Sequence, residues 1–266
     1  MKIIVCVKQV PDTSGKVVIK ENGTLDRALM QTITNPDDLS AVEAALAIKD
    51  KTGCQVIVVT MGPMPAESML RELLARGADR AVLVSAREFG GSDTYATSQI
   101  LAAAIQKIGL EKEDIIMCGR QAIDGDTAQV GPQIAEKLNI PQVTYVGSIK
   151  KVADGLVVHR LLEDGYMKIY VPTPCLITCV KELNKPRYME VKRIFGVYDE
   201  EIEKLDYNAL KDSPLIDPDK IGLKGSPTNI LTSFTPPQKG VGRMLEGSKK
   251  EICEEIAGIL AKKHFI

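Results

Sequence analysis

Residues 118–131 hold the densest set of groups that could bind a ligand. Gly119 and Gly125 let a bound group approach the backbone closely, and acidic and hydroxyl side chains follow before a pattern of helical spacing begins. A helix that begins near Asp126 would leave the backbone N–H groups of residues 127–129 unpaired, and unpaired amides at a helix N-terminus bind phosphate. The stretch is a candidate seat for a pyrophosphate or a nucleotide. The alternative is an ordinary helix with Asp126 as its N-cap.

Residues 90–97 repeat the same arrangement. Two glycines can form a turn, Asp93 can cap the helix that follows, and Thr94 and Thr97 lie three positions apart on its first turn. Two hydroxyl groups on one face of a helix can hydrogen-bond the polar edge of a ring or a ribose. Without other evidence, a segment of this kind more often only caps a helix than binds a ligand.

The elements that must position these residues follow an α/β pattern. Short β-branched runs alternate with longer segments of helical spacing, which is typical of a parallel sheet covered by helices. The predicted strands are residues 2–7, 55–60, 81–85, 114–118 and 143–149. The predicted helices begin at Asn35, as an N-cap before Pro36, and further span residues 63–77, 93–108 and 126–138. We expect a Rossmann-like, doubly wound and mostly parallel sheet, with a ligand crevice beyond the carboxyl ends of its strands. The segments that follow the first four predicted strands, residues 7–13, 60–63, 90–97 and 118–131, are expected to line this crevice.

From residue 150 the pattern changes, and we expect the alternation of parallel strands with crossover helices to end there. Alternating residues with turn signals at Asp154-Gly155 and Asp164-Gly165 predict added β-hairpins. Residues 184–246 are rich in Pro, Lys and Asp and weakly periodic, which predicts an extended arm that needs a partner surface, and residues 247–263 return to helical spacing. We predict a nucleotide- or FAD-binding α/β domain over residues 1–183 and a partner-binding arm with a C-terminal helix over residues 184–266.

Several classes of protein are not indicated. The 266 residues contain neither G-x-G-x-x-G after the first strand nor G-x-x-x-x-G-K-[ST], so any nucleotide must be bound in another way. Two histidines are little material for a metal site, and the six cysteines form no C-x-x-C pair and are expected to be mostly buried. A formal net charge of −1 and the lack of a long apolar stretch predict a cytoplasmic protein without nucleic-acid partners or membrane insertion.

Five motifs, in order, resemble the electron transfer flavoprotein β subunit. They fall within roughly residues 1–195 and are Val5–Thr13, Asn35-Pro36, Gly77–Arg80, Gln121–Gly131 and Asn184–Tyr188. The resemblance implies a Rossmann-like fold that pairs with an α subunit carrying another FAD. Ordinary members of the family hold AMP in the β subunit, whereas flavin-bifurcating members hold FAD there and use NADH.

The resemblance also implies which residues bind the cofactor and the partner. The implied nucleotide-binding residues lie in the crevice predicted above, and they are Cys6, Asn35, Pro36, Asp37, Asp38, Met61, Arg120, Gln121, Ala122, Ile123, Asp124, Gly125, Asp126, Thr127, Ala128, Gln129, Val130, Gly131 and Gln133. Thr94 and Thr97 are implied neighbours of the isoalloxazine and nicotinamide rings. Arg120 is either a positive neighbour of the flavin or a phosphate, or an exposed salt-bridging arginine. Met189, Val191, Ile194 and Phe195 resemble a loop that contacts the partner dehydrogenase, and the alternative is a solvated linker.

The residues around 9–13, 93–97 and 124–131 look like the bifurcating version of the family. This implies an oxidoreductase complex in which NADH gives a hydride to the β-subunit flavin, or NAD is reduced in the reverse direction. Electrons are divided between ferredoxin or flavodoxin and the α-subunit flavin, which serves an acyl-CoA or lactate dehydrogenase. No side chain is assigned a catalytic role, because the cofactor carries the chemistry.

Two alternatives stay open at this point. One is a non-bifurcating β subunit with structural AMP. The other is a non-catalytic nucleotide sensor resembling the universal stress proteins, against which the partner-seeking arm argues.

Overall fold

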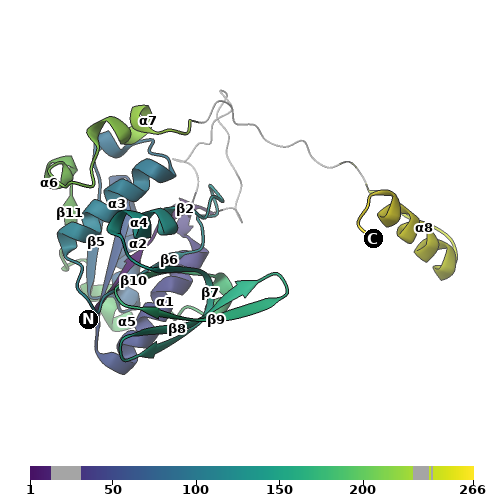
Figure 1. Cartoon of the computed structure of the whole chain (residues 1–266), viewed down its shortest axis with the longest axis horizontal. Helices are drawn as coiled ribbons and strands as arrows, with labels where there is room; N and C mark the ends of the chain where they lie inside the picture. The colour runs from purple at the N-terminus through teal and green to yellow at the C-terminus, as the bar shows by residue number, and fades with distance from the viewer. Residues whose placement is uncertain (13–30, 230–239, 241) are drawn as a thin grey trace.

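A computed structural model describes residues 1–12, 31–229, 240 and 242–266. Thr13 of the first motif, and residues 230–239 and 241 of the predicted arm, lie outside the described residues. The body of the molecule is a nine-stranded, mostly parallel sheet in the order β11-β5-β4-β1-β6-β10-β7-β8-β9, with helices on both faces (Figure 1). This arrangement confirms the predicted Rossmann-like α/β fold.

Four parallel strands form the centre of the sheet, and their bounds lie close to the predicted ones. They are β1 (Lys2–Cys6), β4 (Gln55–Met61), β5 (Arg80–Val84) and β6 (Ile115–Gly119). Their residues are almost continuously buried because helices cover both faces of the sheet. Ile3 and Val5 belong to the core on one face, and Ile4 and Cys6 to the core on the other.

The helices divide between these two faces. Residues of α1 (Pro36–Thr52) and α2 (Glu67–Arg76) pack in the core that contains Ile3, and residues of α3 (Thr94–Ile108) and α4 (Val130–Leu138) in the core that contains Ile4. Strand β1 pairs in parallel with both β4 and β6. The chain runs from β1 through β4 to β5 on one side, and α3 then returns it to β6 on the other side. The switch in strand order therefore lies between β1 and β6, where doubly wound folds bind ligands.

An antiparallel excursion follows α4. Strand β7 (Gln142–Val152) continues into β8 (Gly155–Leu162) and β9 (Gly165–Pro172), with turns where Asp-Gly pairs predicted them. The expectation that the crossover pattern ends near residue 150 is wrong, because β10 (Cys175–Cys179) returns to the parallel sheet between β6 and β7. That place is fixed by pairing with distant strands, which a local pattern does not contain.

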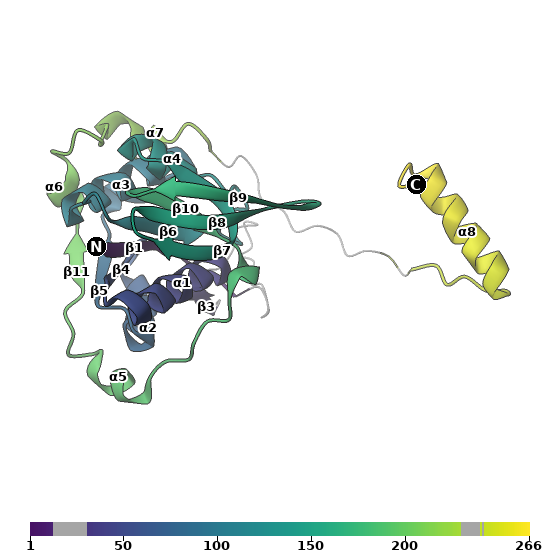
Figure 2. The ribbon, with the colours of Figure 1, turned by 60° about the horizontal axis from the view of Figure 1, so that its bottom comes forward.

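Residues 181–229, called the wrapping segment from here on, run around the body (Figure 2). It passes through η3 (Lys181–Leu183), α5 (Val191–Gly196), β11 (Glu203–Leu205), α6 (Tyr207–Leu210), η4 (Pro218–Lys220) and α7 (Gly222–Gly225). Figure 2 shows this path from α5 past the edge strand β11 to α7. Val197, Ile202, Leu205, Leu210, Ile216 and Ile221 are buried in the two cores of the body. Residues 184–229 thus pack against the body of the same chain, without a partner surface. The proposed domain boundary at residue 184 stays a prediction.

The remaining elements are short or peripheral. Strands β2 (Gln9–Pro11) and β3 (Thr32–Thr34) form an antiparallel pair, and η1 (Met64–Ala66) and η2 (Arg87–Phe89) precede α2 and α3. Helix α8 (Lys249–Lys262) confirms the predicted terminal helix and begins with a complete capping box of Ser248 and Glu251. Within the described ranges, no helix has the length and apolar character needed to cross a membrane.

Candidate functional site

Asp38 joins the two strands that flank the switch point. Its Oδ2 accepts from the backbone N–H of Lys8 at 2.8 Å, and its Oδ1 accepts from that of Gly119 at 2.8 Å. Burial raises the pKa of Asp38 to about 7, although the two amides favour its charged form. A Cβ at Gly119 would clash with Asp38 Oδ1 and would lie 2.6 Å from Asp38 N. The ends of β1 and β6 are therefore held against the first turn of α1, and residue 119 must lack a side chain.

Asn35 connects the same helix start to the loop after β6. Its Nδ2 donates to the carbonyl of Gln121 at 2.8 Å, and its Oδ1 accepts from the N–H of Ile123 at 3.1 Å. Helix α1 begins at Pro36 as predicted, but the side chain of Asn35 makes no capping bond. The predicted cap is corrected because this buried side chain fixes the loop instead.

The loop after β6 adopts an unusual backbone. Asp126 and Ala128 have φ values of 49° and 54°, in the left-handed region that side chains disfavour. Helix α4 begins only at Val130, so the predictions of a helix from Asp126 and of Asp126 as its N-cap are wrong. The two left-handed residues interrupt the helix, and Asp126 instead accepts from Gln121 Nε2 at 2.7 Å.

The amides of residues 127–129, called the amide cradle from here on, have no acceptor among the described residues. Ala128 has a left-handed φ and Gln129 is right-handed, with φ −106° and ψ −28°. Successive residues of opposite hand are typical of backbone segments whose N–H groups bind an anion. The cradle also precedes the N-terminus of a helix, where the dipole favours negative charge. Its chemistry therefore fits a phosphate, as the sequence predicted, although the cradle precedes the helix and is not its first turn.

Close packing places α4 directly on the sheet. A Cβ at Gly131 would lie 2.7 Å from Cys118 Sγ and 2.8 Å from Thr178 Cγ2. Glycine at this position lets the start of α4 approach β6 and β10. Val130 is the first residue of α4, and Gln133 lies in the same first turn. The Oε1 of Gln133 is buried without a hydrogen-bond partner among the described residues.

The start of α3 lies beside the cradle. Asp93 accepts from the N–H of Ala96 at 3.0 Å, which confirms the predicted cap. The Oγ1 of Thr94 lies 3.5 Å from Gln129 Oε1, which also contacts Gln133 Nε2 at 3.1 Å. Thr97 lies one turn further along α3 and is half-buried. The structure thus brings the two predicted binding segments together.

A cavity of about 500 Å³ opens next to the loop after β6, residues 120–129, called the cradle loop from here on. Asp124 contributes to its wall from that loop, and Met61 contributes from the end of β4. Thr60 also lines it, and its buried Oγ1 has no hydrogen-bond partner among the described residues. Gln9, Val10, Pro11, Gly62 and Pro63 complete the wall from the two segments that the sequence placed at the crevice, after β1 and after β4. Thr32, Pro65, Ala66 and Ser68 also line the cavity and were not predicted, because they lie on β3, on η1 and at the start of α2 and not directly after a predicted strand.

Two ion pairs border this region. Lys8 Nζ lies 2.7 Å from Asp124 Oδ1 and connects the end of β1 to the cradle loop. Arg120 Nε lies 3.3 Å from Asp37 Oδ2 in the first turn of α1. Burial raises the pKa of Asp37, and the Arg120 charge lowers it in part. Arg120 thus makes a salt bridge and has a partly exposed side chain, and its role beside a flavin or a phosphate stays a prediction.

Cys6 lies beneath the crevice. It is buried at the end of β1 and is in register with Cys118 of β6. Burial raises the pKa of the Cys6 thiol to about 12 and that of Cys118 well above its usual value. Both thiols are therefore neutral near pH 7 and act as small core side chains. Five cysteines are buried as predicted, and Cys253 is exposed.

The predicted partner-binding residues lie on and before α5, away from the cavity wall. Val191 and Phe195 are 71% and 79% exposed, and Met189 and Ile194 are each 36% exposed. They form an apolar surface together with the exposed side chains of Tyr188 and Tyr198.

Comparisons with known proteins agree with this geometry. A family model described as the electron transfer flavoprotein domain matches residues 23–210. The acryloyl-CoA reductase electron transfer subunit gamma of Anaerotignum propionicum is 66% identical over 267 residues, which is 100% of both chains. The caffeyl-CoA reductase-Etf complex subunit CarD of Acetobacterium woodii is 50% identical, and the electron transfer flavoprotein subunit beta of Clostridium acetobutylicum is 47% identical, each over 100% of both chains.

Proposed function

Because the chain belongs to the electron transfer flavoprotein family, we propose that it is the β subunit of a heterodimeric electron carrier within an oxidoreductase complex. The support is the match over most of the chain, together with three relatives that align over their full length. Two of them are named as electron transfer subunits, and the third as a subunit of a reductase-Etf complex. The proposed activity requires a second, α subunit. The chain by itself is then a carrier and not an independent enzyme.

We propose that the crevice holds FAD. The single observation that carries this is the amide cradle, which offers unpaired donors beside the switch point. A cavity of about 500 Å³ and the unpartnered Oγ1 of Thr60 lie next to the same loop, so the residues present fit a nucleotide. Residues 127–129 would hold a phosphate, and Met61 and Thr60 would line the adjacent part of the nucleotide.

When bound, the flavin would supply hydride and one-electron chemistry. The chain's own part is to position it. Asp38 and Asn35 fix the strand ends and the loop that carries the cradle. Thr94 and Thr97 provide hydroxyl groups on the first turn of α3, and that of Thr94 lies within reach of Gln129. These hydroxyl groups could bind the polar edge of a ring.

We further propose the NADH-using, bifurcating sub-type, with ferredoxin or flavodoxin and an acyl-CoA dehydrogenase as partners. The support is the pair of threonines beside the cradle and the names of two relatives, which belong to acryloyl-CoA and caffeyl-CoA reductase systems. A lactate dehydrogenase of the flavin-dependent class is the second candidate partner. The exposed apolar surface of α5 is the proposed docking site for the dehydrogenase.

The test is the cofactor content of the purified αβ complex, followed by titration with NADH. For the bifurcating sub-type we expect two FAD and no AMP per heterodimer, and bleaching of the flavin absorbance by NADH. One FAD with one AMP, and no response to NADH, would instead establish the non-bifurcating carrier.

A further inference from the structure

Polar contacts attach the segment that leads to the proposed docking surface, residues 184–190, to the body. Residues 184–190 have no regular secondary structure, yet they run along the outer face of α1. Asn184 Nδ2 donates to the carbonyl of Ser40 at 2.9 Å, and Glu190 N donates to the carbonyl of Ala75 at 3.0 Å. The segment is thereby attached to α1 at one end and to α2 at the other.

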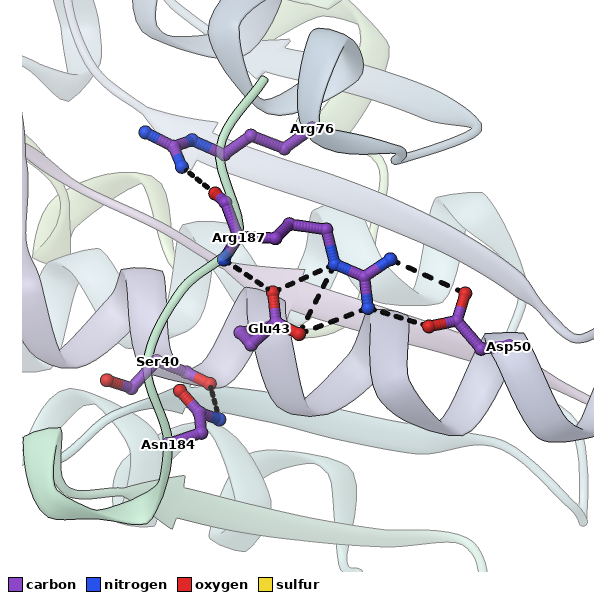
Figure 3. Close-up of polar contacts among 6 residues, drawn as sticks. All are labelled: Ser40, Glu43, Asp50, Arg76, Asn184 and Arg187. Atoms are coloured by element: carbon purple, nitrogen blue, oxygen red, sulfur yellow. Dashed lines mark hydrogen bonds and ion pairs between the residues drawn. The ribbon is translucent and has the colours of Figure 1, made fainter. Parts of the chain in front are cut away.

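Arg187 is the centre of this attachment (Figure 3). Its backbone N–H donates to Glu43 Oε2 at 2.9 Å, and its Nε lies 3.0 Å from the same oxygen. Its Nη2 reaches Glu43 Oε1 at 3.0 Å and Asp50 Oδ2 at 2.7 Å. Its carbonyl accepts from Arg76 of α2. One residue thus uses its backbone and its planar guanidinium group to join the segment to two helices.

The two carboxylates are arranged for a single arginine. Glu43 and Asp50 are seven residues apart on α1, so they lie on one face two turns from each other. The double contact raises the pKa of Arg187, and the Arg187 contact lowers the pKa of Asp50. A lysine at position 187 has one compact charge, so it cannot reproduce the paired contacts to both carboxylates.

Helix α5 depends on such attachments. Six residues are too few to form a stable isolated helix. On its inner side Arg193 Nη1 donates to the carbonyls of Leu74 and Ala78 at 3.2 Å and 3.3 Å, at the end of α2. Its outer side chains, Val191 and Phe195, are left exposed. The polar contacts therefore order the helix, while its apolar face stays free for a partner.

We propose that Arg187, held by Glu43 and Asp50, is a positioning residue that keeps residues 188–198 in the conformation that docks the dehydrogenase. This rests on the proposed function, because the dehydrogenase is the occupant that the function assigns to the α5 surface. An ordered surface loses less conformational freedom on binding than a loose one. The arginine clasp, meaning Arg187 with Glu43 and Asp50, thus increases affinity without touching the partner.

The test compares Arg187→Gln, Arg187→Lys and a control, Arg80→Gln, in the intact αβ complex. The control also removes an arginine that ties the wrapping segment to the body, through Glu203, but beyond α5. Two quantities are measured: hydrogen exchange of the amides of residues 188–198, and steady-state electron transfer to a purified acyl-CoA dehydrogenase that the wild-type complex reduces.

Arg187→Gln is expected to speed exchange in residues 188–198 and to raise the KM for the dehydrogenase about tenfold, with kcat changed less than about twofold. Arg187→Lys is expected to give a smaller effect, and Arg80→Gln none. In a Phe195→Ala background, which removes an exposed contact, Arg187→Gln is expected to raise KM much less, because both changes act through the same surface.

Unchanged exchange and KM in Arg187→Gln would overturn the proposal, as would a KM effect of full size in the Phe195→Ala background. If the wild-type complex reduces no acyl-CoA dehydrogenase, the proposed partner is wrong. The docking role of the clasp is then wrong as well. The exchange data would then separately show whether the clasp orders α5.

Discussion

At the scale of residues, the site depends on a few positions where two backbone segments approach each other. Asp38 accepts hydrogen bonds from backbone N–H groups at the ends of β1 and β6, and its carboxylate occupies the space that a side chain at position 119 would need. Asn35 holds the loop that carries the cradle by donating one hydrogen bond to its backbone and accepting another. In the proposed function, these side chains position the cofactor indirectly, through the backbone that they hold.

Replacing Gly119 by alanine is expected to reduce the free energy of unfolding by about 1–3 kcal/mol, because the added methyl group overlaps Asp38. The measurement is urea unfolding of the heterodimer. Gly125→Ala is the matched control, since a Cβ there meets nothing within 4 Å, and a change below about 0.5 kcal/mol is expected. Equal effects of the two substitutions would contradict the close approach at Gly119.

The pH dependence of stability is expected to reflect Asp38. Its pKa is raised to about 7, whereas an aspartate in the unfolded chain has a pKa of about 3.9. Between these values the native state binds more protons, so the contribution of Asp38 is fully present below about pH 4 and is lost as pH rises to about 7.

Asp38→Asn removes that dependence. The unfolding free energy, measured by urea denaturation between about pH 4.5 and pH 7, should fall with pH more steeply in the wild type than in the variant, by up to about 1.4 kcal/mol per pH unit. Parallel curves for the two proteins would show that Asp38 does not hold its proton in this range.

At the scale of elements, the sequence predicted the central strands because their β-branched runs are continuous and end at turn residues. It did not predict the true start of α4, since the residues around Asp126 resemble a good N-terminus and the left-handed backbone at Ala128 has no sequence signal. The Cys175–Cys179 strand was missed as a sheet member because its partners are distant in sequence. The amides of residues 127–129 nevertheless lie in the predicted segment, and their role in binding a phosphate stays a prediction.

Substitutions at Ala128 test the cradle. Ala128→Pro fixes φ near −65° and removes one of the amides, so it is expected to lower the nucleotide content of the purified complex severely. Ala128→Gly accepts the left-handed conformation, and it should keep full nucleotide content with an unfolding free energy within about 1 kcal/mol of wild type. The readout is nucleotide released per heterodimer, and full content in Ala128→Pro would refute the role of the cradle.

At the scale of the whole molecule, the wrapping segment is a part of the body. Its apolar residues are spaced too irregularly to show helical or strand periodicity, so the sequence suggested an arm that needs a partner. In the structure β11 extends the sheet beside β5, and Leu205 and Ile202 are buried against the cores. The exposed face of α5 is the part of this segment that we propose to need another protein.

Leu205→Ala is therefore expected to destabilise the entire protein by about 2–5 kcal/mol, in a single unfolding transition. Leu223→Ala, in the same segment but 61% exposed, should change stability by less than about 0.5 kcal/mol. Thermal unfolding followed by circular dichroism distinguishes them. A Leu205→Ala protein with an unchanged midpoint would mean that the wrapping segment does not contribute to the fold.

The most direct test of the central claim is a crystal structure of the purified heterodimer with its own cofactors. We expect a nucleotide at the carboxyl ends of β1, β4 and β6, with a phosphate oxygen within hydrogen-bonding distance of the amides of residues 127–129. A nucleotide bound elsewhere on this chain, or an amide cradle occupied by protein acceptors of the α subunit, would contradict it.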